Sequence, residues 1–384
     1  MNILYVTYKD PRVKDGGNEL RTHLLWEALK KKGKVYTLVF NFLQNDQVIY
    51  QETDNPICFY NPKISRHYLN RIAYQIITKI SGLPVLPFVK FTPKRLPEFF
   101  EGISFDIIVG RYVHSLQFYH LWEYAPTYID IDDHPTQVYE TLIQHQLPFV
   151  LRPLGRWVNK IQFKNIQKNI SGGWIANQEQ QALCDNHIRH LPNIPIIPSD
   201  NYNPVSDRYE YLLTIGVMSY APNYLGVDTF LKEIWPNFHS KYPNIKYLIG
   251  GKGVPESYRT KWAAIEGVKY IGYIDDLNMA YEKCAAVVVP IYTGGGTCIK
   301  TLEALAYSRI CFSTPFGVRG ISGDIDLEDK GLFVFESDSE FISKYKQMQN
   351  SEERNIMEMK GKEFIYKYFS KESFECAVNS IIDI

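Results

Sequence analysis

The 384-residue sequence predicts an α/β protein built from two Rossmann-like, doubly wound domains that face each other across a cleft. Short apolar strands alternate with stretches of helical periodicity in both halves of the chain. This alternation is typical of parallel sheets covered on both faces. The length is sufficient for two or three domains. A proline-rich stretch, 191–208, interrupts the alternation and is the expected linker.

The first half of the chain is expected to form an N-terminal domain over 1–195. An apolar strand over 2–8 opens it, since these residues lack the basic leader and cleavage site of a signal peptide. A polar loop with Gly16 and Gly17 follows, and helical spacing then runs over 18–32. Further strands are expected at 34–40, 105–110, 127–131 and 173–176.

The second half repeats the alternation and is expected to form a domain over 208–368. Strands are expected at 211–215, 245–249, 268–271, 286–290 and 332–335. Helices are expected at 223–240, 275–283, 298–307, 337–350 and 351–369. Folds of this kind bind ligands at the carboxyl ends of their strands, so the loops after these strands are the candidate site.

Composition excludes several classes of protein. The 42 basic and 42 acidic residues give no net charge, which argues against a dedicated nucleic-acid binder. A hydrophobic content of 45% excludes a disordered chain. The six cysteines have no C-x-x-C spacing, which disfavours a zinc site or a disulfide framework and favours the cytoplasm. No apolar run reaches the roughly 20 residues of a membrane-spanning helix.

The most informative segment is 287–320, where an apolar strand leads through a glycine loop into a helix. The loop would let the backbone approach a ligand closely, through Gly294, Gly295 and Gly296. The free N–H groups and the dipole of the following helix favour an anion. Lys300 in the first turn opposes that dipole unless an anion is bound, and Glu303 shares its helix face. The alternative is a tight turn followed by a solvated Lys300–Glu303 pair.

The pattern G-G-G-T-x-x-K-x-x-E-A-x-A, followed by S-T-P-x-G, resembles the donor-binding region of retaining glycosyltransferases of the two-domain GT-B type, close to family 4, or group 1. Segments 213–223 and 268–290 resemble other parts of that family. The resemblance implies transfer of a sugar from a UDP- or GDP-linked donor to an acceptor hydroxyl, with retention and without a metal or other cofactor. It also implies bacterial polysaccharide or glycoconjugate assembly, and a last helix, 369–384, packed on the N-terminal domain.

The resemblance further implies individual roles for the matching residues. Glu303 would bind the nucleotide ribose. Lys300, Thr297 and the amides of the glycine loop would hold the diphosphate. Tyr273 would lie beside the base. The remaining donor contacts would come from glycines in other loops: Gly16, Gly17 and Gly216.

The chain departs from the family pattern in the donor region. Many relatives carry an acid eight positions before the residue matching Glu303, where this chain has Gly295. Many also carry an arginine and a lysine in the region of Val217 and Asn223, so we expect Lys300 to replace these phosphate-binding cations. The missing acid leaves open a non-catalytic nucleotide-sugar-binding partner. A sugar-nucleotide epimerase of the same fold is also open, whereas a nicotinamide dehydrogenase is disfavoured because no G-x-G-x-x-G follows the first strand.

The end of the strand at 127–131 supplies the catalytic candidates. Relatives often have a histidine there, whereas this chain reads I-D-I-D-D-H-P. Asp132 or Asp133 is expected to contact the acceptor or the donor sugar, and Arg111 after the neighbouring strand is expected to face the same region. The alternatives are helix capping by the acids and a buried ion pair with Arg111. Weaker candidates are His114, Lys252 and Arg319.

Two segments concentrate positive charge. Residues 61–100 contain seven Lys or Arg and one acid, and residues 152–168 carry a basic residue at every fourth position beside apolar ones. Both segments could contact an anionic membrane surface, which would make the protein peripheral on the inner face of the membrane. An ordinary amphipathic helix with a solvated lysine face is the alternative for 152–168. Together with the nucleotide-sugar and the sugar or lipid-linked acceptor that the resemblance implies, an anionic membrane surface is an expected partner, whereas nucleic acid is not.

Overall fold

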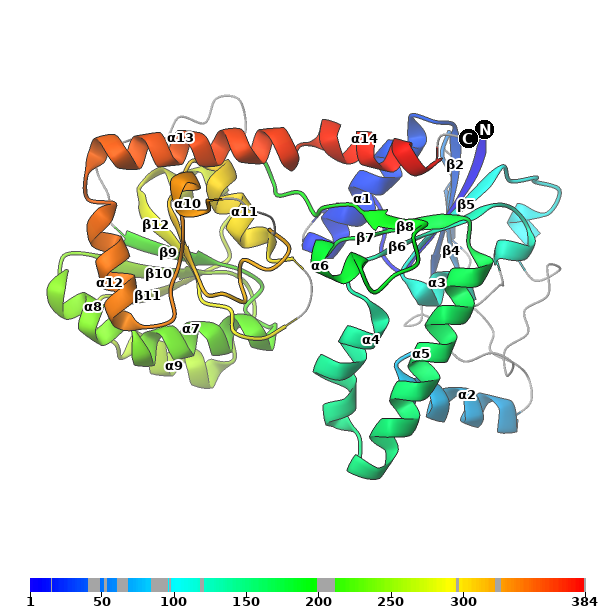
Figure 1. Cartoon of the computed structure of the whole chain (residues 1–384), viewed down its shortest axis with the longest axis horizontal. Coiled ribbons are helices and arrows are strands. Elements are labelled where there is room, and N and C mark those ends of the chain that lie inside the picture. The colour runs from blue at the N-terminus through cyan, green and yellow to red at the C-terminus, as the bar shows by residue number, and fades with distance from the viewer. Residues whose placement is uncertain are drawn as a thin grey trace. The chain divides into compact units, whose positions relative to one another are not determined.

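The computed structural model describes residues 1–14, 16–40, 49–51, 54–60, 68–83, 96, 98–117, 121–198, 211–294, 297–321 and 326–382. The chain divides into two compact units (Figure 1). Unit 1 comprises Met1–Pro192 with Phe374–Ile384, and unit 2 comprises Asn193–Ser373. Within the described ranges, no helix has both the length and the apolar content needed to cross a membrane.

Among the described residues of unit 1, eight strands form one sheet in the order β3-β4-β2-β1-β5-β6-β7-β8. All neighbouring strands are parallel except β3 and β4. The strands are β1 (Asn2–Thr7), β2 (Lys34–Phe40), β3 (Ile49–Gln51), β4 (Ile57–Tyr60), β5 (Ile107–Arg111), β6 (Thr127–Ile131), β7 (Gly172–Ile175) and β8 (Ile188–His190). The parallel core confirms the predicted α/β class.

The described part of unit 1 contains seven α-helices. They are α1 (Gly17–Lys30), α2 (Tyr68–Ser81), α3 (Val113–Gln117), α4 (Pro135–Val138), α5 (Arg152–Asn169), α6 (Gln178–Gln181) and α14 (Lys371–Ile382). Figure 1 shows α14, at the end of the chain, beside α1. Lys31 forms an ion pair with Glu375 at 2.5 Å, and Phe374 is buried within 5.8 Å of the Arg21 guanidinium. The last helix is therefore part of the core of unit 1.

Unit 2 contains a fully parallel sheet of six strands among its described residues, in the order β11-β10-β9-β12-β13-β14. The strands are β9 (Tyr211–Ile215), β10 (Lys246–Gly250), β11 (Val268–Gly272), β12 (Cys284–Val289), β13 (Cys311–Ser313) and β14 (Leu332–Val334). The helices are α7 (Ala221–Glu233), α8 (Trp235–Lys241), α9 (Glu256–Ala263), α10 (Leu277–Glu282), α11 (Ile299–Ala306), α12 (Asp338–Gln347) and α13 (Ser351–Tyr368). Figure 1 shows helices on both faces of this sheet, so the unit is doubly wound as predicted.

One predicted helix, 223–240, is wrong as a single element. The structure has two helices there, α7 and α8, which meet at Ile234. Pro236 lies in the first turn of α8 and has no N–H to continue the hydrogen bonding of α7. The proline therefore ends one helix and begins the next, although the apolar spacing runs through both.

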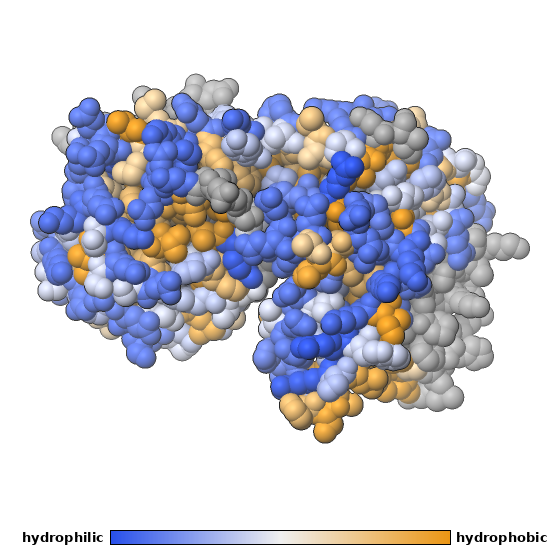
Figure 2. Space-filling model, in the orientation of Figure 1, coloured by the Kyte–Doolittle hydropathy of each residue, from blue (hydrophilic) through white to orange (hydrophobic). Residues whose placement is uncertain are grey.

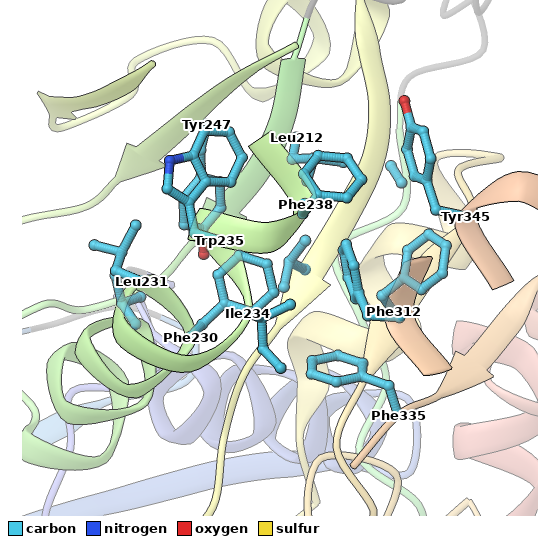
Figure 3. Close-up of a cluster of buried hydrophobic side chains, with 14 of the residues drawn as sticks. Leu212, Phe230, Leu231, Ile234, Trp235, Phe238, Tyr247, Phe312, Phe335 and Tyr345 are labelled. Atoms are coloured by element: carbon cyan, nitrogen blue, oxygen red, sulfur yellow. The ribbon is translucent and has the colours of Figure 1, made fainter. Parts of the chain in front are cut away.

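The core of unit 2 is rich in aromatic side chains (Figure 3). Phe230 of α7 is fully buried there. Its ring centroid lies 5.2 Å from those of Tyr247 and Phe341 and 6.1 Å from that of Phe335. These rings come from elements far apart in the sequence, so the cluster joins α7 and α12 to the sheet.

We expect Phe230→Ala to destabilise unit 2 by about 3–5 kcal/mol, because the neighbouring rings cannot fill the cavity left behind. The free energy of unfolding from urea denaturation measures this. Met279→Ala is the control, because Met279 is exposed and its loss is expected to change stability by no more than about 0.5 kcal/mol. Equal effects of the two substitutions would contradict the packing described.

Candidate functional site

In unit 2 the strand order reverses direction at β9, which pairs with β10 on one side and with β12 on the other. The connections after β9 and β12 therefore leave toward opposite faces of the sheet, and the carboxyl ends of these strands are open to a ligand. The two loops also touch. A Cβ atom on Gly294, whose φ is +133°, would lie 3.3 Å from the hydroxyl of Tyr220. The glycine loop thus lies against the start of α7.

Lys300, in the first turn of α11, extends to the loop that follows β9. Its Nζ donates a 2.8 Å hydrogen bond to Oδ1 of Asn223, and Nδ2 of Asn223 donates to the carbonyl of Val217 at 2.8 Å. A Cβ atom on Gly216 would lie only 2.5 Å from Cε of Lys300. The absence of a side chain at Gly216 therefore makes room for the lysine stem. Together these contacts hold one cation at the strand ends.

The N-terminus of α11 has no side-chain cap. Its N-cap residue, Cys298, makes no capping hydrogen bond through its side chain, and the first turn contains no acid. Thr297 precedes it and is buried, and the hydroxyl of Thr301 donates to the carbonyl of Gly317 at 2.8 Å. The helix dipole and Lys300 thus present two positive groups in the same place, which suits an anion such as a phosphate.

Glu303 lies one turn further along α11 and is only 9% exposed, so the solvated Lys300–Glu303 pair is not formed. The hydroxyl of Tyr281 donates a 2.7 Å hydrogen bond to Oε1 of Glu303. Tyr281 is itself stacked on Tyr307, with ring centroids 4.1 Å apart. Burial raises the pKa of Glu303, and the bond from Tyr281 and the charge of Lys300 oppose that rise. The carboxylate is held in a fixed orientation and can accept hydrogen bonds from ligand hydroxyls.

An aromatic side chain follows β11 at the carboxyl end of the same sheet. Tyr273 is exposed, and Nζ of Lys252, from the loop after β10, lies 3.8 Å from the centroid of its ring. An exposed ring beside a cation offers a flat surface on which a nucleotide base could stack. Arg319 is half-buried, and its guanidinium lies 3.4 Å from the centroid of the Phe316 ring.

In unit 1, the double glycine lies at the start of α1. Gly16 is the N-cap residue in an extended conformation without a side-chain cap, and Gly17 is the first residue of the helix. Glu19 lies in the first turn and forms an ion pair with Lys9 at 2.7 Å. This helix end therefore already has an acidic side chain, paired with a lysine, unlike the N-terminus of α11.

The catalytic candidates after β5 and β6 form a buried ion network. Arg111 donates to Asp130 at 2.8 Å and to both oxygens of Asp132 at 2.8 and 2.9 Å. Arg21 of α1 donates to Asp130 at 2.5 and 3.0 Å. Both arginines and Asp130 are fully buried or nearly so, whereas Asp132 is 18% exposed. Arg111 thus forms the ion pair that the sequence left open, and of these four groups Asp132 is the most accessible to a ligand.

The backbone is strained next to this network. Tyr112 has a φ of +68°, which is unfavourable for a residue with a large side chain. Its ring lies 4.2 Å from the Arg111 guanidinium, which also donates a 3.2 Å hydrogen bond to its hydroxyl. The cost of the strain is offset by these contacts, which fix the orientation of Arg111.

Asp133 and His134 point to other partners. Asp133 accepts a 3.2 Å hydrogen bond from the side chain of Gln180. His134, rather than an aspartate, caps α4, because its Nδ1 accepts from the amide of Thr136 at 3.2 Å. Burial lowers the pKa of His134. Asp132 and Asp133 are therefore adjacent in sequence but contact different groups.

Arg21 and Tyr281, which contact the main acids of these clusters, were not predicted from the sequence. Arg21 shares a helix face with apolar residues three and four positions later, Leu24 and Leu25, which was a signal that it is buried. Tyr281 gave no comparable signal, because its contact with Glu303 joins two helices.

The predicted Gly295 and Gly296, and the side chain of His114, lie outside the described residues. Among the described residues, no group of three or more His, Cys, Asp or Glu could hold a metal ion.

Residues 209–350 match the family described as "Glycosyl transferases group 1". Among solved structures, the chain is similar to sucrose-phosphate synthase from Thermosynechococcus elongatus, with a TM-score of 0.69, 14% identity, and coverage of 100% of this chain and 98% of that one. It is also similar to an E. coli structure described as trehalose-6-phosphate bound with UDP-2-fluoro glucose, with a TM-score of 0.64, 11% identity, and coverage of 100% and 99%.

A third similar structure is WaaG, described as a glycosyltransferase involved in lipopolysaccharide biosynthesis. Its TM-score is 0.63 at 14% identity, with 99% of each chain covered. No curated protein matches the chain. At these identities the solved structures establish the fold, and the family match covers residues 209–350.

We expect Asp130→Asn to destabilise unit 1 by about 3–5 kcal/mol, because it leaves two buried guanidinium groups short of a carboxylate. Burial opposes ionisation of Asp130, but Arg21 and Arg111 hold its pKa below the usual value. The stabilisation is therefore present above the unfolded pKa, near 4, and is lost as the pH falls through the folded value.

Urea unfolding at about pH 7 and about pH 3 measures this effect. The difference in unfolding free energy between the wild type and Asp130→Asn should be large at the higher pH and smaller at the lower one. Asp185→Asn, at an exposed position in the same unit, is the control. A difference that stays constant with pH would contradict the assignment to the Asp130 charge.

Proposed function

We propose that the protein transfers a sugar from a UDP- or GDP-linked donor to an acceptor hydroxyl, with retention. The proposal is supported by the match of residues 209–350 to the group 1 glycosyltransferases and by the GT-B fold of the chain. One observation carries the choice of donor. The charged amine of Lys300 is fixed at the uncapped N-terminus of α11, because it is bonded to Asn223 and its stem packs on Gly216. Two adjacent phosphates match two adjacent positive groups.

The other groups at the strand ends suit the rest of a nucleotide-sugar. Glu303 is oriented by Tyr281 and lies one turn from Lys300, where it would accept hydrogen bonds from ribose hydroxyls. Tyr273 would lie against the base. The similarity to an E. coli structure bound with UDP-2-fluoro glucose supports this class of donor.

The departing nucleoside diphosphate gains negative charge as the sugar bond breaks. Groups fixed in advance stabilise such a charge without reorganising during the reaction. Lys300 and the dipole of α11 supply this stabilisation from the protein itself, and we propose that no metal ion is required.

On the acceptor side, we propose that Asp132 contacts the reacting sugar or the acceptor hydroxyl. It is partly exposed, and Arg111 holds both of its oxygens. Arg111 is fully buried, so its proposed role is to position Asp132 rather than to contact substrate. Asp133, oriented by Gln180, is the second candidate for contact with the acceptor.

We further propose that the acceptor is a sugar or a lipid-linked sugar in polysaccharide or glycoconjugate assembly, and that the enzyme works on the inner face of a membrane. The exposed cations of α5 support contact with anionic lipid. The similarity to WaaG is consistent with this setting. Much of the other basic segment, 61–100, lies outside the described residues.

A non-catalytic donor-binding protein is the second candidate, because Gly295 stands where many relatives carry an acid. Release of free nucleoside diphosphate distinguishes the two candidates. The enzyme releases free UDP or GDP when given donor and acceptor, whereas the binding protein shows a thermal shift with the donor but releases none.

We expect the melting temperature to rise with UDP or GDP, or their sugars, in a panel that also includes ADP, CMP and dTDP. Lys300→Ala should weaken nucleotide binding about tenfold or more, because it removes one charge-assisted contact to the diphosphate. Lys346→Ala, an exposed lysine of α12, is the matched control. No shift with any nucleotide would refute the proposed donor.

Gly216→Ala tests whether the position of Lys300 matters as well as its charge. The new Cβ would displace the flexible end of Lys300 from Asn223, while the fold should tolerate the change. We therefore expect an unchanged melting temperature without ligand and weaker nucleotide binding, close to that of Lys300→Ala. Binding equal to that of the wild type would show that Lys300 need not be held at this place.

Removing divalent metal tests the proposed role of Lys300 and the α11 dipole in stabilising the leaving group. Nucleotide binding and UDP or GDP release should be the same with excess EDTA and with added Mg²⁺. Activity that disappears in EDTA and returns with Mg²⁺ would contradict metal independence but not the proposed donor.

A further inference from the structure

Unit 1 exposes a continuous set of large apolar side chains around the start of α5. Phe149 and Val150, which directly precede this helix, are 79% and 78% exposed. Along α5 itself Trp157 is 61% exposed, and Leu154 and Ile161 are also exposed. Figure 2 shows hydrophobic side chains gathered at this end of the unit, below the labels of α4 and α5 in Figure 1. Clusters of this kind mark a surface that contacts something other than water.

The exposed residues of α5 lie on the side of the helix opposite the one that packs against the rest of unit 1. The inward side includes Gly155, Asn159 and Phe163, all buried. Asn159 donates to the carbonyl of Ser81 at 2.9 Å, and a Cβ on Gly155 would lie 2.4 Å from the carbonyl of Ile80. The helix is therefore held firmly on one side while its other side presents apolar groups outward.

A groove lies between α2 and α5 next to this set. Its volume is about 310 Å³, within the range of small-ligand sites. The lining is apolar apart from one glutamine and comprises Ile77, Ile80, Leu154, Trp157, Val158, Ile161 and Gln162. A groove without charged groups suits a hydrocarbon chain rather than a sugar.

Positive charge surrounds the apolar surface. Basic residues recur at every fourth position of α5, and neither α5 nor α2 contains an Asp or Glu. Four of these cations are exposed: Arg156, Lys160, Lys164 and Lys168. Arg156 has a long contact with Glu140, at 3.4 Å. An apolar surface bordered by cations complements a bilayer with anionic headgroups.

We propose that unit 1 docks on an anionic lipid bilayer through Phe149, Val150 and the outer side of α5, and that the α2–α5 groove takes a hydrocarbon chain of a lipid. Phe149 and Val150 enter the headgroup–acyl boundary, and Trp157 lies at that depth beside the groove. The cations of α5 contact the headgroups. This inference rests on the proposed membrane location and adds insertion into the acyl region.

A second copy of the chain is a poorer occupant of the same surface. A two-fold dimer would bring the same face of both copies together. The cations of α5 would then face one another without acids from α5 or α2 to balance them. A lipid bilayer supplies the opposite charge, and a second copy does not.

Flotation of the full chain with vesicles tests the docking. We expect binding to phosphatidylcholine vesicles containing phosphatidylglycerol, weaker binding at high salt, and little binding to pure phosphatidylcholine. Phe149→Ser with Val150→Ser should weaken binding about tenfold or more, because the inserting side chains are lost. Ile356→Ser with Met359→Ser, two exposed apolar residues of α13, is the matched control and should bind as the wild type.

Tryptophan fluorescence tests the depth of insertion. Trp157 is the exposed tryptophan of the six in the chain, since the others are buried or half-buried. Lipids brominated on their acyl chains should therefore quench the wild type, and Trp157→Phe should remove most of that quenching. Flotation without quenching would overturn insertion and groove binding, and would leave only headgroup adhesion.

Light scattering distinguishes lipid binding from dimer formation, and the thermal shift distinguishes failure of this inference from failure of the proposed donor. A dimer in light scattering that Phe149→Ser with Val150→Ser converts to a monomer would overturn the lipid proposal in favour of a second copy. The nucleotide-induced thermal shift should be the same in this double variant as in the wild type. Failure of membrane binding with an intact thermal shift would refute this inference alone, and the reverse result would refute the proposed donor alone.

Discussion

The two candidate clusters, around Lys300 in unit 2 and around Asp132 in unit 1, both depend on a reversal of strand order in the sheet of their unit. A central parallel strand that pairs on both sides sends its own loop and its neighbour's loop to opposite faces. In unit 2 this reversal lies between β9 and β12 and brings Lys300 to the loop containing Gly216. In unit 1 it lies between β1 and β5, and Arg111 ends the second of these strands.

The two units use this position differently. In unit 2 the positive groups at this position form no ion pair with an acid among the residues that the structure describes. The N-terminus of α11 lacks a side-chain cap, and the hydrogen bond of Lys300 goes to the neutral amide of Asn223. In unit 1 the arginines are fully neutralised by acids, and Asp130 lies between them with no exposure. The first arrangement suits binding of an external anion. The second suits a rigid support that leaves one carboxylate, Asp132, partly accessible.

The outer side of α5 is a third feature, separate from the strand ends. Several large apolar side chains on the exposed side are unusual for a surface helix, which commonly has a polar outer face. Here the outer side combines Trp157 with exposed cations, and the preceding turn adds Phe149 and Val150. The same unit that carries Asp132 therefore also carries the surface proposed to reach lipid.

The sequence by itself determined the α/β class, most strands and the segment with Lys300 and Glu303, because these depend on local periodicity and on contiguous residues. It misjudged 223–240, where Pro236 outweighs apolar spacing. Only the tertiary structure paired Tyr281 with Glu303, Asn223 with Lys300 and Arg21 with Asp130. The last of these pairs is separated by more than a hundred residues. Sequence spacing fixes which residues share an element, whereas packing of distant elements decides which charges are neutralised and which stay open to a ligand.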